Sequence, residues 1–347
     1  MMMNAPMITA LGRLGPVTWR ELQSFAGALS EFCAVQVLPD RQIRSDVHAG
    51  GLHLQWSDGT ARVRIEAPSP ASAQNLRDML AYMLDNVREG LAADLRWLQN
   101  VPQAGALPPT FRFATVMDSQ RITPRFQRIR LAAKDIAYLT QGGLHIRLLQ
   151  PKVAADPRWP SLGANGRTIW PGGDHLHMPV YTMRAIDDAA GWIDVDIYLH
   201  GNGPTCLWAK TARAGTRIGI TGPGGGGLSD NAHLILGGDE TALPAIARML
   251  EAAPAHATGQ AMIEVAYKAE IQPIAAPAGV ALTWLIRGNG PALATAFARA
   301  AKAALDTNPE AEIFFGGEKS IAQQLRENLR APHGKLPANA SIAAYWS

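Results

Sequence analysis

The sequence predicts a multidomain protein with three parts. We expect a small α+β domain over residues 15–95, an antiparallel six-stranded β-barrel over 110–228 and an α/β Rossmann-like domain over 232–347. The barrel is predicted because six short alternating segments follow one another without long helices between them. The last domain is predicted because apolar segments of strand length then alternate with helical patterns, which is typical of a parallel sheet.

Composition excludes several classes of protein. The net charge is only +3, and no block of basic residues is present, so we expect no nucleic-acid partner. The two cysteines, Cys33 and Cys206, lie too far apart in sequence for a CxxC or zinc motif. No apolar run approaches the ~20 residues of a membrane span, and the first residues lack a signal-peptide pattern. We therefore expect a cytoplasmic protein without stable membrane association.

Local signals place the elements of the first domain. Residues 18–21 have capping-box spacing and predict a helix that runs through Phe32. Alternating segments on both sides of Asp58-Gly59 predict a β-hairpin. Residues 69–90 carry one apolar face, begin with Ser-Pro and end in glycine, so they predict a second helix. No catalytic constellation is visible in this domain.

A stretch rich in proline and glycine, residues 101–109, reads as a linker to the barrel. The predicted barrel strands are FRFATV (111–116), FQRIRL (126–131), LHIRLL (144–149), VYTMRAI (180–186), WIDVDIYL (192–199) and TRIGIT (216–221). The long loop over 150–178 suggests a functional segment. The predicted strands of the last domain are 234–240, 262–267, 281–286 and 312–317, with a helix opened by Pro291 among those between and after them.

The stretch from Val180 to Leu207 carries the chemistry of a nucleotide site. Tyr181 offers a flat aromatic face, Thr182 a hydroxyl and Arg184 a fixed positive charge. The Gly201–Pro204 loop leads into a short apolar run that can begin a helix, whose free amides suit phosphates. A barrel followed by a parallel sheet further suggests two ligands that meet at a domain seam. A flavin is the favoured ligand.

Several segments in order resemble one known family. They are 122–130, 181–184, 200–209, 222–224, 238–244, 316–318 and the pair Tyr345-Trp346. Together these segments resemble the siderophore-interacting proteins, which are ferric-siderophore reductases of the ferredoxin-reductase-like flavoprotein superfamily. Residues 20–90 look like a small uncharacterised domain that is fused to some members of this family.

The resemblance implies FAD on the barrel, with NAD(P)H or ferredoxin as reductant and a ferric siderophore as partner. It implies that Tyr181 stacks on the isoalloxazine and that Thr182 approaches its N5 edge. The implied cofactor-binding residues are Tyr181, Thr182, Met183, Arg184, His200, Gly203, Pro204, Thr205, Gly222, Gly238, Asp239, Glu240, Thr241, Gly317, Glu318 and Trp346. Lys268 and Arg287 are candidates for binding an NADPH phosphate or the ferric chelate.

One position departs from the family pattern. The family places an arginine two residues before the tyrosine, where it clamps the FAD phosphates, and Pro179 stands there in this chain. Proline cannot replace a guanidinium fork. Arg184, Arg147 or Arg125 are candidates to compensate, and FMN or weakly bound FAD is the alternative to tight FAD binding.

Simpler explanations apply to some candidates. His200 can cap a strand end, the 239–241 segment can cap the following helix, and Lys268 and Arg287 can be solvated surface charges. Gly222, Gly224 and Gly227 match G-x-G-x-x-G, but a strand follows too closely for the helix that this motif needs. We interpret them as a loop near the adenosine part of the flavin.

Three functions remain for comparison. The first is a ferric-siderophore reductase, in which a flavin passes electrons from NAD(P)H to chelated Fe(III). The second is an NAD(P)H-flavin oxidoreductase with another acceptor, such as a quinone, free flavin or ferredoxin. The third is a non-catalytic siderophore- or flavin-binding protein that lost tight FAD binding, which Pro179 favours. No side chain is assigned as a catalytic acid, base or metal ligand.

Overall fold

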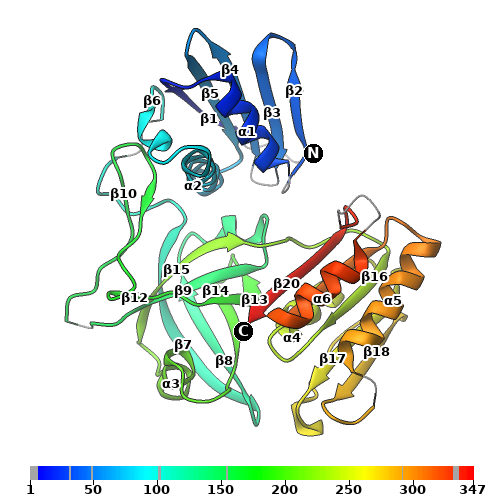
Figure 1. Cartoon of the computed structure of the whole chain (residues 1–347). Coiled ribbons are helices and arrows are strands. Elements are labelled where there is room, and N and C mark those ends of the chain that lie inside the picture. The colour runs from blue at the N-terminus through cyan, green and yellow to red at the C-terminus, as the bar shows by residue number, and fades with distance from the viewer. Residues whose placement is uncertain are drawn as a thin grey trace.

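The computed structural model describes residues 7–30, 33–47, 50–100, 103–153, 155–290, 292–330 and 336–347. Three units follow one another along the chain, as Figure 1 shows. The N-terminal part (blue) forms a sheet with two helices, and the middle part (cyan to green) forms a barrel. The C-terminal part (yellow to red) forms a sheet layered with helices. Within the described residues, no helix is long and apolar enough to cross a membrane.

The N-terminal domain is an antiparallel sheet in the order β2-β3-β4-β5-β1-β6, packed on two helices. Its elements are β1 (Ile8–Leu14), α1 (Trp19–Leu29), β2 (Val35–Leu38), β3 (Gln42–Val47), β4 (Gly50–Ser57), β5 (Thr60–Ala67), α2 (Pro70–Val87) and β6 (Leu95–Trp97). Strand β1 lies before residue 15, where the sequence places the start of this domain, and pairs with both β5 and β6. The predicted helix end, Phe32, lies outside the described residues.

Two local signals are realised as predicted. The Glu21 amide donates to Thr18 Oγ1 at 3.2 Å, and the Thr18 amide donates to Glu21 Oε2 at 2.7 Å, which completes the capping box of α1. Between β4 and β5, both Asp58 (φ 49°) and Gly59 (φ 76°) are left-handed, which is the conformation of a two-residue hairpin turn. The apolar faces of both helices pack against one core with the sheet.

The barrel closes because its first and last neighbours also pair. The order β9-β13-β14-β8-β7-β15 is completed by pairing of β15 with β9. The strands are β7 (Phe111–Thr123), β8 (Phe126–Ala133), β9 (His145–Pro151), β13 (Val180–Asp187), β14 (Trp192–Tyr198) and β15 (Arg217–Gly224), and α3 is Pro204–Thr211. The long loop before β13 holds the short strands β10 (Ser161–Leu162), β11 (Thr168–Ile169) and β12 (Leu176–His177). All six predicted strands are confirmed.

The C-terminal sheet is parallel throughout, in the order β18-β17-β16-β19-β20. Its elements are β16 (His233–Gly238), α4 (Leu243–Ala252), β17 (Thr258–Val265), β18 (Gly279–Ile286), α5 (Leu293–Thr307), β19 (Glu312–Glu318), α6 (Lys319–Leu329) and β20 (Ala340–Trp346). Alternate residues of β16 face opposite layers: Leu234 and Leu236 pack with α4, whereas Ile235 packs with α5 and α6. Pro291, expected to open α5, lies outside the described residues.

The strand order reverses between β16 and β19, because the chain leaves β18 and returns on the other side of β16. In open parallel sheets, ligands bind beyond the carboxyl ends of the strands at such a reversal. Close packing supports this arrangement: a Cβ on Gly237 would lie 2.3 Å from Cδ2 of Phe297, so only glycine lets α5 approach β16. The fold therefore directs the carboxyl ends of β16 and β19 toward the barrel seam.

Candidate functional site

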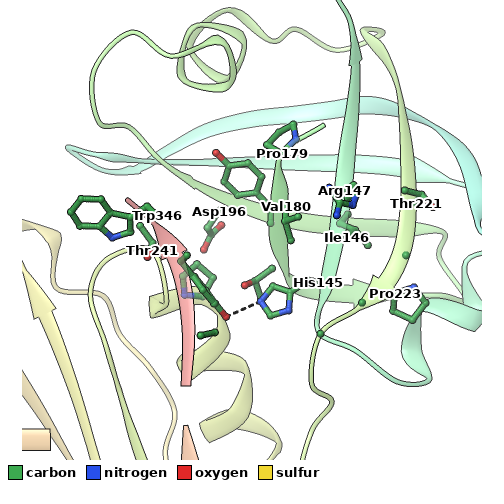
Figure 2. A pocket seen from close by; sticks show the side chains of 18 of the residues that line it. His145, Ile146, Arg147, Pro179, Val180, Asp196, Thr221, Pro223, Thr241 and Trp346 are labelled. Atoms are coloured by element: carbon green, nitrogen blue, oxygen red, sulfur yellow. Dashed lines mark hydrogen bonds between the residues drawn. The ribbon is translucent and has the colours of Figure 1, made fainter. Parts of the chain in front are cut away.

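A cavity of about 760 Å³ lies where the three domains meet. Its floor is the outer face of three neighbouring barrel strands, on which Val180, Arg147 and Thr221 lie side by side in register. Figure 2 shows these residues on adjacent strands, with Thr241 and Trp346 across the cavity from them. Helix α2 of the N-terminal domain contributes Asn75 and Asp78. A cavity of this size is typical of small-molecule and cofactor sites.

Tyr181 and Thr182, at the start of β13, form the polar and aromatic part of the wall. Burial raises the pKa of Tyr181 to about 12, so the ring stays neutral and offers a flat face. Thr182 is 4% exposed, and its Oγ1 has no hydrogen-bond partner among the described residues. A buried hydroxyl without a partner is uncommon and is explained if a bound ligand completes it.

His145 and Tyr345 join the barrel to strand β20 at the edge of the cavity. Their Nε2 and hydroxyl oxygen are hydrogen-bonded at 2.8 Å, the contact drawn as a dashed line in Figure 2. Burial lowers the pKa of the imidazole. His145 is therefore neutral at pH 7 and acts as a structural contact across the seam.

The buried acids of the cavity wall are already satisfied. Asp196 accepts two bonds of 2.7 Å from Arg128. Glu240 accepts one bond of 2.6 Å from Arg287 and another of 2.7 Å from the Ala266 amide. Because these charges are paired, they do not leave the cavity with an acidic potential.

Asp239 holds the turn between β16 and α4 and also holds the end of β20. Its Oδ1 accepts from the Thr241 amide at 2.8 Å, within the turn that precedes α4. The expectation that residues 239–241 cap this helix is wrong, because the N-cap residue is Ala242 and no side chain caps the helix there. Its Oδ2 accepts from Trp346 Nε1 at 2.7 Å. The carboxylate therefore positions Thr241 and Trp346, both of which line the cavity.

The structure brings part of the predicted set together. The cavity is lined by Tyr181, Thr182, His200, Gly222, Glu240, Thr241 and Trp346. Outside its lining lie Met183, Arg184, Gly203, Pro204, Thr205, Gly238, Asp239, Gly317, Glu318, Lys268 and Arg287. Some of these have other partners: Met183 is in the barrel core, and Arg184 makes two bonds of 2.6 Å to Glu251 of α4.

The candidates to compensate for Pro179 at the predicted phosphate end differ in whether they line the cavity. Pro179 lines the cavity, and Arg147 lies on the neighbouring strand, where its guanidinium donates to the Met178 carbonyl at 3.5 Å. Arg125 lies over the ring of Tyr267 and outside the lining. The first turn of α3 is joined to β12 by the hydrogen bond of 2.8 Å between Thr205 Oγ1 and His177 Nε2.

The sequence interpretation did not select several lining residues. His145 and Asp196 lie within predicted strands, and their alternation gives no sign that they face a cavity. Asn75 and Asp78 lie on a predicted helix of another domain, 103 or more residues before Tyr181, the first of the implied cofactor-binding residues. Arg147 differs from these residues, because the sequence interpretation names it as a candidate to compensate for Pro179, and it does line the cavity.

Two family models match the barrel and the C-terminal domain. Residues 115–227 match the family model of the siderophore-interacting FAD-binding domain, and residues 231–347 match that of the siderophore-interacting protein. The residues before 115 lie outside both matches.

Individual relatives agree with these matches. An uncharacterised protein of Mycobacterium tuberculosis is 39% identical over 48% of this chain and 65% of its own length. The ferric vibriobactin reductase ViuB of Vibrio cholerae is 31% identical over 48% of this chain and 63% of its own length. These matches thus span less than two thirds of either relative. The crystal structure of a siderophore utilization protein from T. fusca is 32% identical, with a TM-score of 0.57, over 70% of this chain and 95% of that one.

Proposed function

Since this chain belongs to the siderophore-interacting protein family, we propose that it is a flavin-dependent oxidoreductase that reduces Fe(III) in a ferric siderophore. The observation that carries the proposal is the cavity between barrel and parallel sheet, with Tyr181 and Thr182 on its wall. The Oγ1 of Thr182 has no hydrogen-bond partner among the residues that the structure describes. A ferric vibriobactin reductase among the relatives supports the reaction class.

FAD is the proposed cofactor, and the ring end of the site fits it. Tyr181 supplies an aromatic face, and Thr182 supplies a buried hydroxyl that makes no hydrogen bond within the described part of the chain. Residues 203–205, at the N-terminus of α3, are the proposed contact for the pyrophosphate, because helix N-termini favour phosphates. Pro179 offers no donor there, so FMN is the alternative to FAD.

The reductant is proposed to approach from the parallel sheet. The carboxyl ends of β16 and β19 lie at the strand-order reversal, where dinucleotides bind in such sheets. Thr241, which follows β16, lines the cavity. A nicotinamide cofactor placed there would face the ring end, and a reduced ferredoxin is the alternative donor.

When bound, a flavin can take two electrons from a nicotinamide and deliver them singly to chelated iron. The protein then supplies position and shielding: Tyr181 orients the ring, and Tyr345 and Trp346 cover it from β20. Fe(II) binds hard-oxygen chelators weakly, so reduction releases the metal. No side chain is required as an acid or base at the iron. A cytoplasmic location is part of the proposal, because both Cys33 and Cys206 are free thiols.

A visible absorption spectrum tests the cofactor, and ferric-chelate reduction tests the reaction. We expect the purified protein to take up FAD or FMN, and to form Fe(II) from ferric siderophores when NADH, NADPH or reduced ferredoxin is supplied. Faster turnover with quinone or free flavin than with any ferric chelate would favour the second enzyme class. Flavin or chelate binding without any Fe(II) would favour the non-catalytic binding protein.

A further inference from the structure

The β10–β11 hairpin (residues 161–170) lies in the long loop before β13 and meets the N-terminal domain. Its two strands form a sheet of their own, separate from the barrel sheet. A two-stranded hairpin alone is marginally stable in water, so its position depends on what it packs against. Figure 1 shows β10 beside β6 and α2 of the N-terminal domain.

Helix α2 holds one side of the hairpin through hydrogen bonds. Gln74 Nε2 donates to the Gly166 carbonyl at 2.8 Å. Thr168 donates to both oxygens of Asp78, from its amide at 2.7 Å and from Oγ1 at 2.6 Å. Gln74 is fully buried and Thr168 is 5% exposed, so water competes little for these bonds.

Further contacts bind the turn of the hairpin to the same domain. Arg167 pairs with Asp85 of α2 at 2.6 Å. The Trp97 indole donates to the Asn165 carbonyl at 2.8 Å, and the Asn165 side-chain amide donates to the Ala92 carbonyl at 3.2 Å. Together with the bonds of Gln74 and Asp78, these contacts bind four consecutive hairpin residues and fix the hairpin on the N-terminal domain.

The end of the fixed hairpin carries an aromatic side chain into the cavity. Trp170 lines the cavity and is 40% exposed, so part of its indole surface is open to a ligand. Only Ile169 separates it from Thr168, and the bonds that hold Thr168 therefore limit where Trp170 can lie. Stacking on a planar ring depends on the position and orientation of both rings. A fixed hairpin meets that requirement.

We propose that the N-terminal domain positions Trp170, through Asp78 and Thr168, so that its indole stacks on an aromatic ring of the ligand. The proposal rests on the proposed function, which supplies two sources of such a ring: the flavin nucleotide and the aryl groups of a catecholate ferric chelate. Trp170 is then a specificity residue, and Asp78 and Thr168 are positioning residues. The N-terminal domain thereby takes part in the choice of ligand.

Variants of Trp170 test the stacking. Trp170→Ala removes the ring, whereas Trp170→Phe keeps an aromatic face. Tyr82→Ala is the matched control, because Tyr82 is 60% exposed on α2 and lies outside the cavity lining. Each variant is first compared with the wild type by thermal unfolding. Its apoprotein is then titrated with FMN and FAD by fluorescence, and the flavin-loaded protein is assayed with ferric chelates.

Trp170→Ala is expected to weaken binding of the stacked ligand about 5- to 100-fold, whereas Trp170→Phe and Tyr82→Ala retain most of it. If the ring belongs to the flavin nucleotide, the dissociation constant rises for FAD alone when the ring is adenine, and for FMN as well when it is the isoalloxazine. If the ring belongs to the substrate, flavin binding and kcat are unchanged. KM then rises for a ferric tris-catecholate but not for ferric citrate, which is also anionic but has no aromatic ring.

Two results would overturn the stacking. One is equal behaviour of Trp170→Ala and Tyr82→Ala with every ligand. The other is an equal loss in Trp170→Ala and Trp170→Phe, which would show that the aromatic face is not what binds.

A second comparison tests whether the N-terminal domain acts through Trp170. Thr168→Val removes the Oγ1 bond to Asp78 but keeps the amide bond and the shape of the side chain. Thr307→Val is its control, because Thr307 is exposed on α5 and its Oγ1 donates within that helix. We expect Thr168→Val to weaken binding of the same ligand about 2- to 10-fold, and to add nothing in the double variant with Trp170→Ala. No loss in Thr168→Val, or additive losses in the double variant, overturns the positioning role.

Failure of the proposed function gives a different result. A wild-type protein that takes up no flavin and forms no Fe(II) refutes that function. The Trp170 site is then measured by calorimetry with AMP and with gallium tris-catecholate, which keeps the rings of the ferric chelate without its reducible metal. Binding of either probe to the wild type and to Tyr82→Ala, with loss in Trp170→Ala, supports stacking. Absence of binding of both probes overturns it.

Discussion

Replacing Glu251 with glutamine tests whether Arg184 joins two domains. Arg184 on β13 makes two bonds of 2.6 Å to Glu251 on α4, and these bonds cross from the barrel to the parallel sheet. The neighbouring Arg248 adds a bond of 2.9 Å to the Met183 carbonyl. The sequence predicts a cofactor role for Arg184, whereas this geometry gives it a structural role at the seam.

The expected cost follows from the exposure of the pair. The side chain of Arg184 is 13% exposed and that of Glu251 is 33% exposed, so the pair is between a surface and a buried ion pair. Surface pairs contribute about 0–1 kcal/mol, and breaking a buried pair costs about 3–5 kcal/mol. Asp196 Oδ2, 4.0 Å from Arg184 Nε, partly offsets the loss. We expect Glu251→Gln to lower the free energy of unfolding by about 1–2 kcal/mol.

Urea unfolding followed by tryptophan fluorescence measures this change. Glu327→Gln is the control, because Glu327 is exposed on α6. Flavin affinity is expected to change by less than about threefold, since neither partner lines the cavity and the bond from Arg248 to the Met183 carbonyl still joins the two domains. An unchanged unfolding midpoint together with a tenfold loss of flavin affinity would refute the structural role and restore the cofactor role.

Three further outcomes are expected. Tyr181→Ala weakens flavin binding about 5- to 100-fold in a fluorescence titration, because stacking on an aromatic ring contributes about 1–3 kcal/mol, whereas Tyr181→Phe retains most of it; equal losses in both variants would contradict stacking. The Thr18 amide and Arg88 lower the pKa of Glu21 from 4.5 to about 2. The stability from this shift is present above pH 4.5 and is lost as the pH falls toward 2. Glu21→Gln therefore flattens the dependence of the unfolding free energy on pH between about pH 5 and 2.5, as measured by urea unfolding. An unchanged dependence in the variant would count against the capping box. Tyr345→Phe lowers the free energy of unfolding in urea by about 0.5–1.5 kcal/mol. The pKa of His145 in an NMR titration stays lowered in this variant, because burial is the main cause of the shift. A return of that pKa to its ordinary value would assign the shift to Tyr345.

Elements with local signals could be predicted from the sequence. The capping box at Thr18 and the Asp58-Gly59 turn each depend on residues within four positions, and the structure realises both. The barrel strands were also predictable, because alternation marks each strand independently of its partner. The strand order of the sheets was not predictable in this way, since it depends on pairing between distant segments.

Long-range contacts explain what sequence reasoning missed. Strand β1 pairs with β5 more than 40 residues later, and β20 pairs with β19 from beyond an intervening helix. Arg184 and Arg287 carry the charge expected of ligand-binding residues, but acids 67 and 47 positions away bind them. No local sequence pattern predicts these ion-pair partners. The same reason hides Asn75, whose place in the cavity depends on how α2 packs on the barrel.

A cavity whose walls belong to three domains links ligand affinity to domain docking. A molecule in which α2 has moved away lacks one wall, so the apparent dissociation constant rises by the inverse of the docked fraction. Conversely, a bound ligand stabilises the docked arrangement of the three domains. Arg167 and Asp85, which do not line the cavity, therefore contribute to ligand affinity through the 2.6 Å ion pair that keeps the N-terminal domain in place.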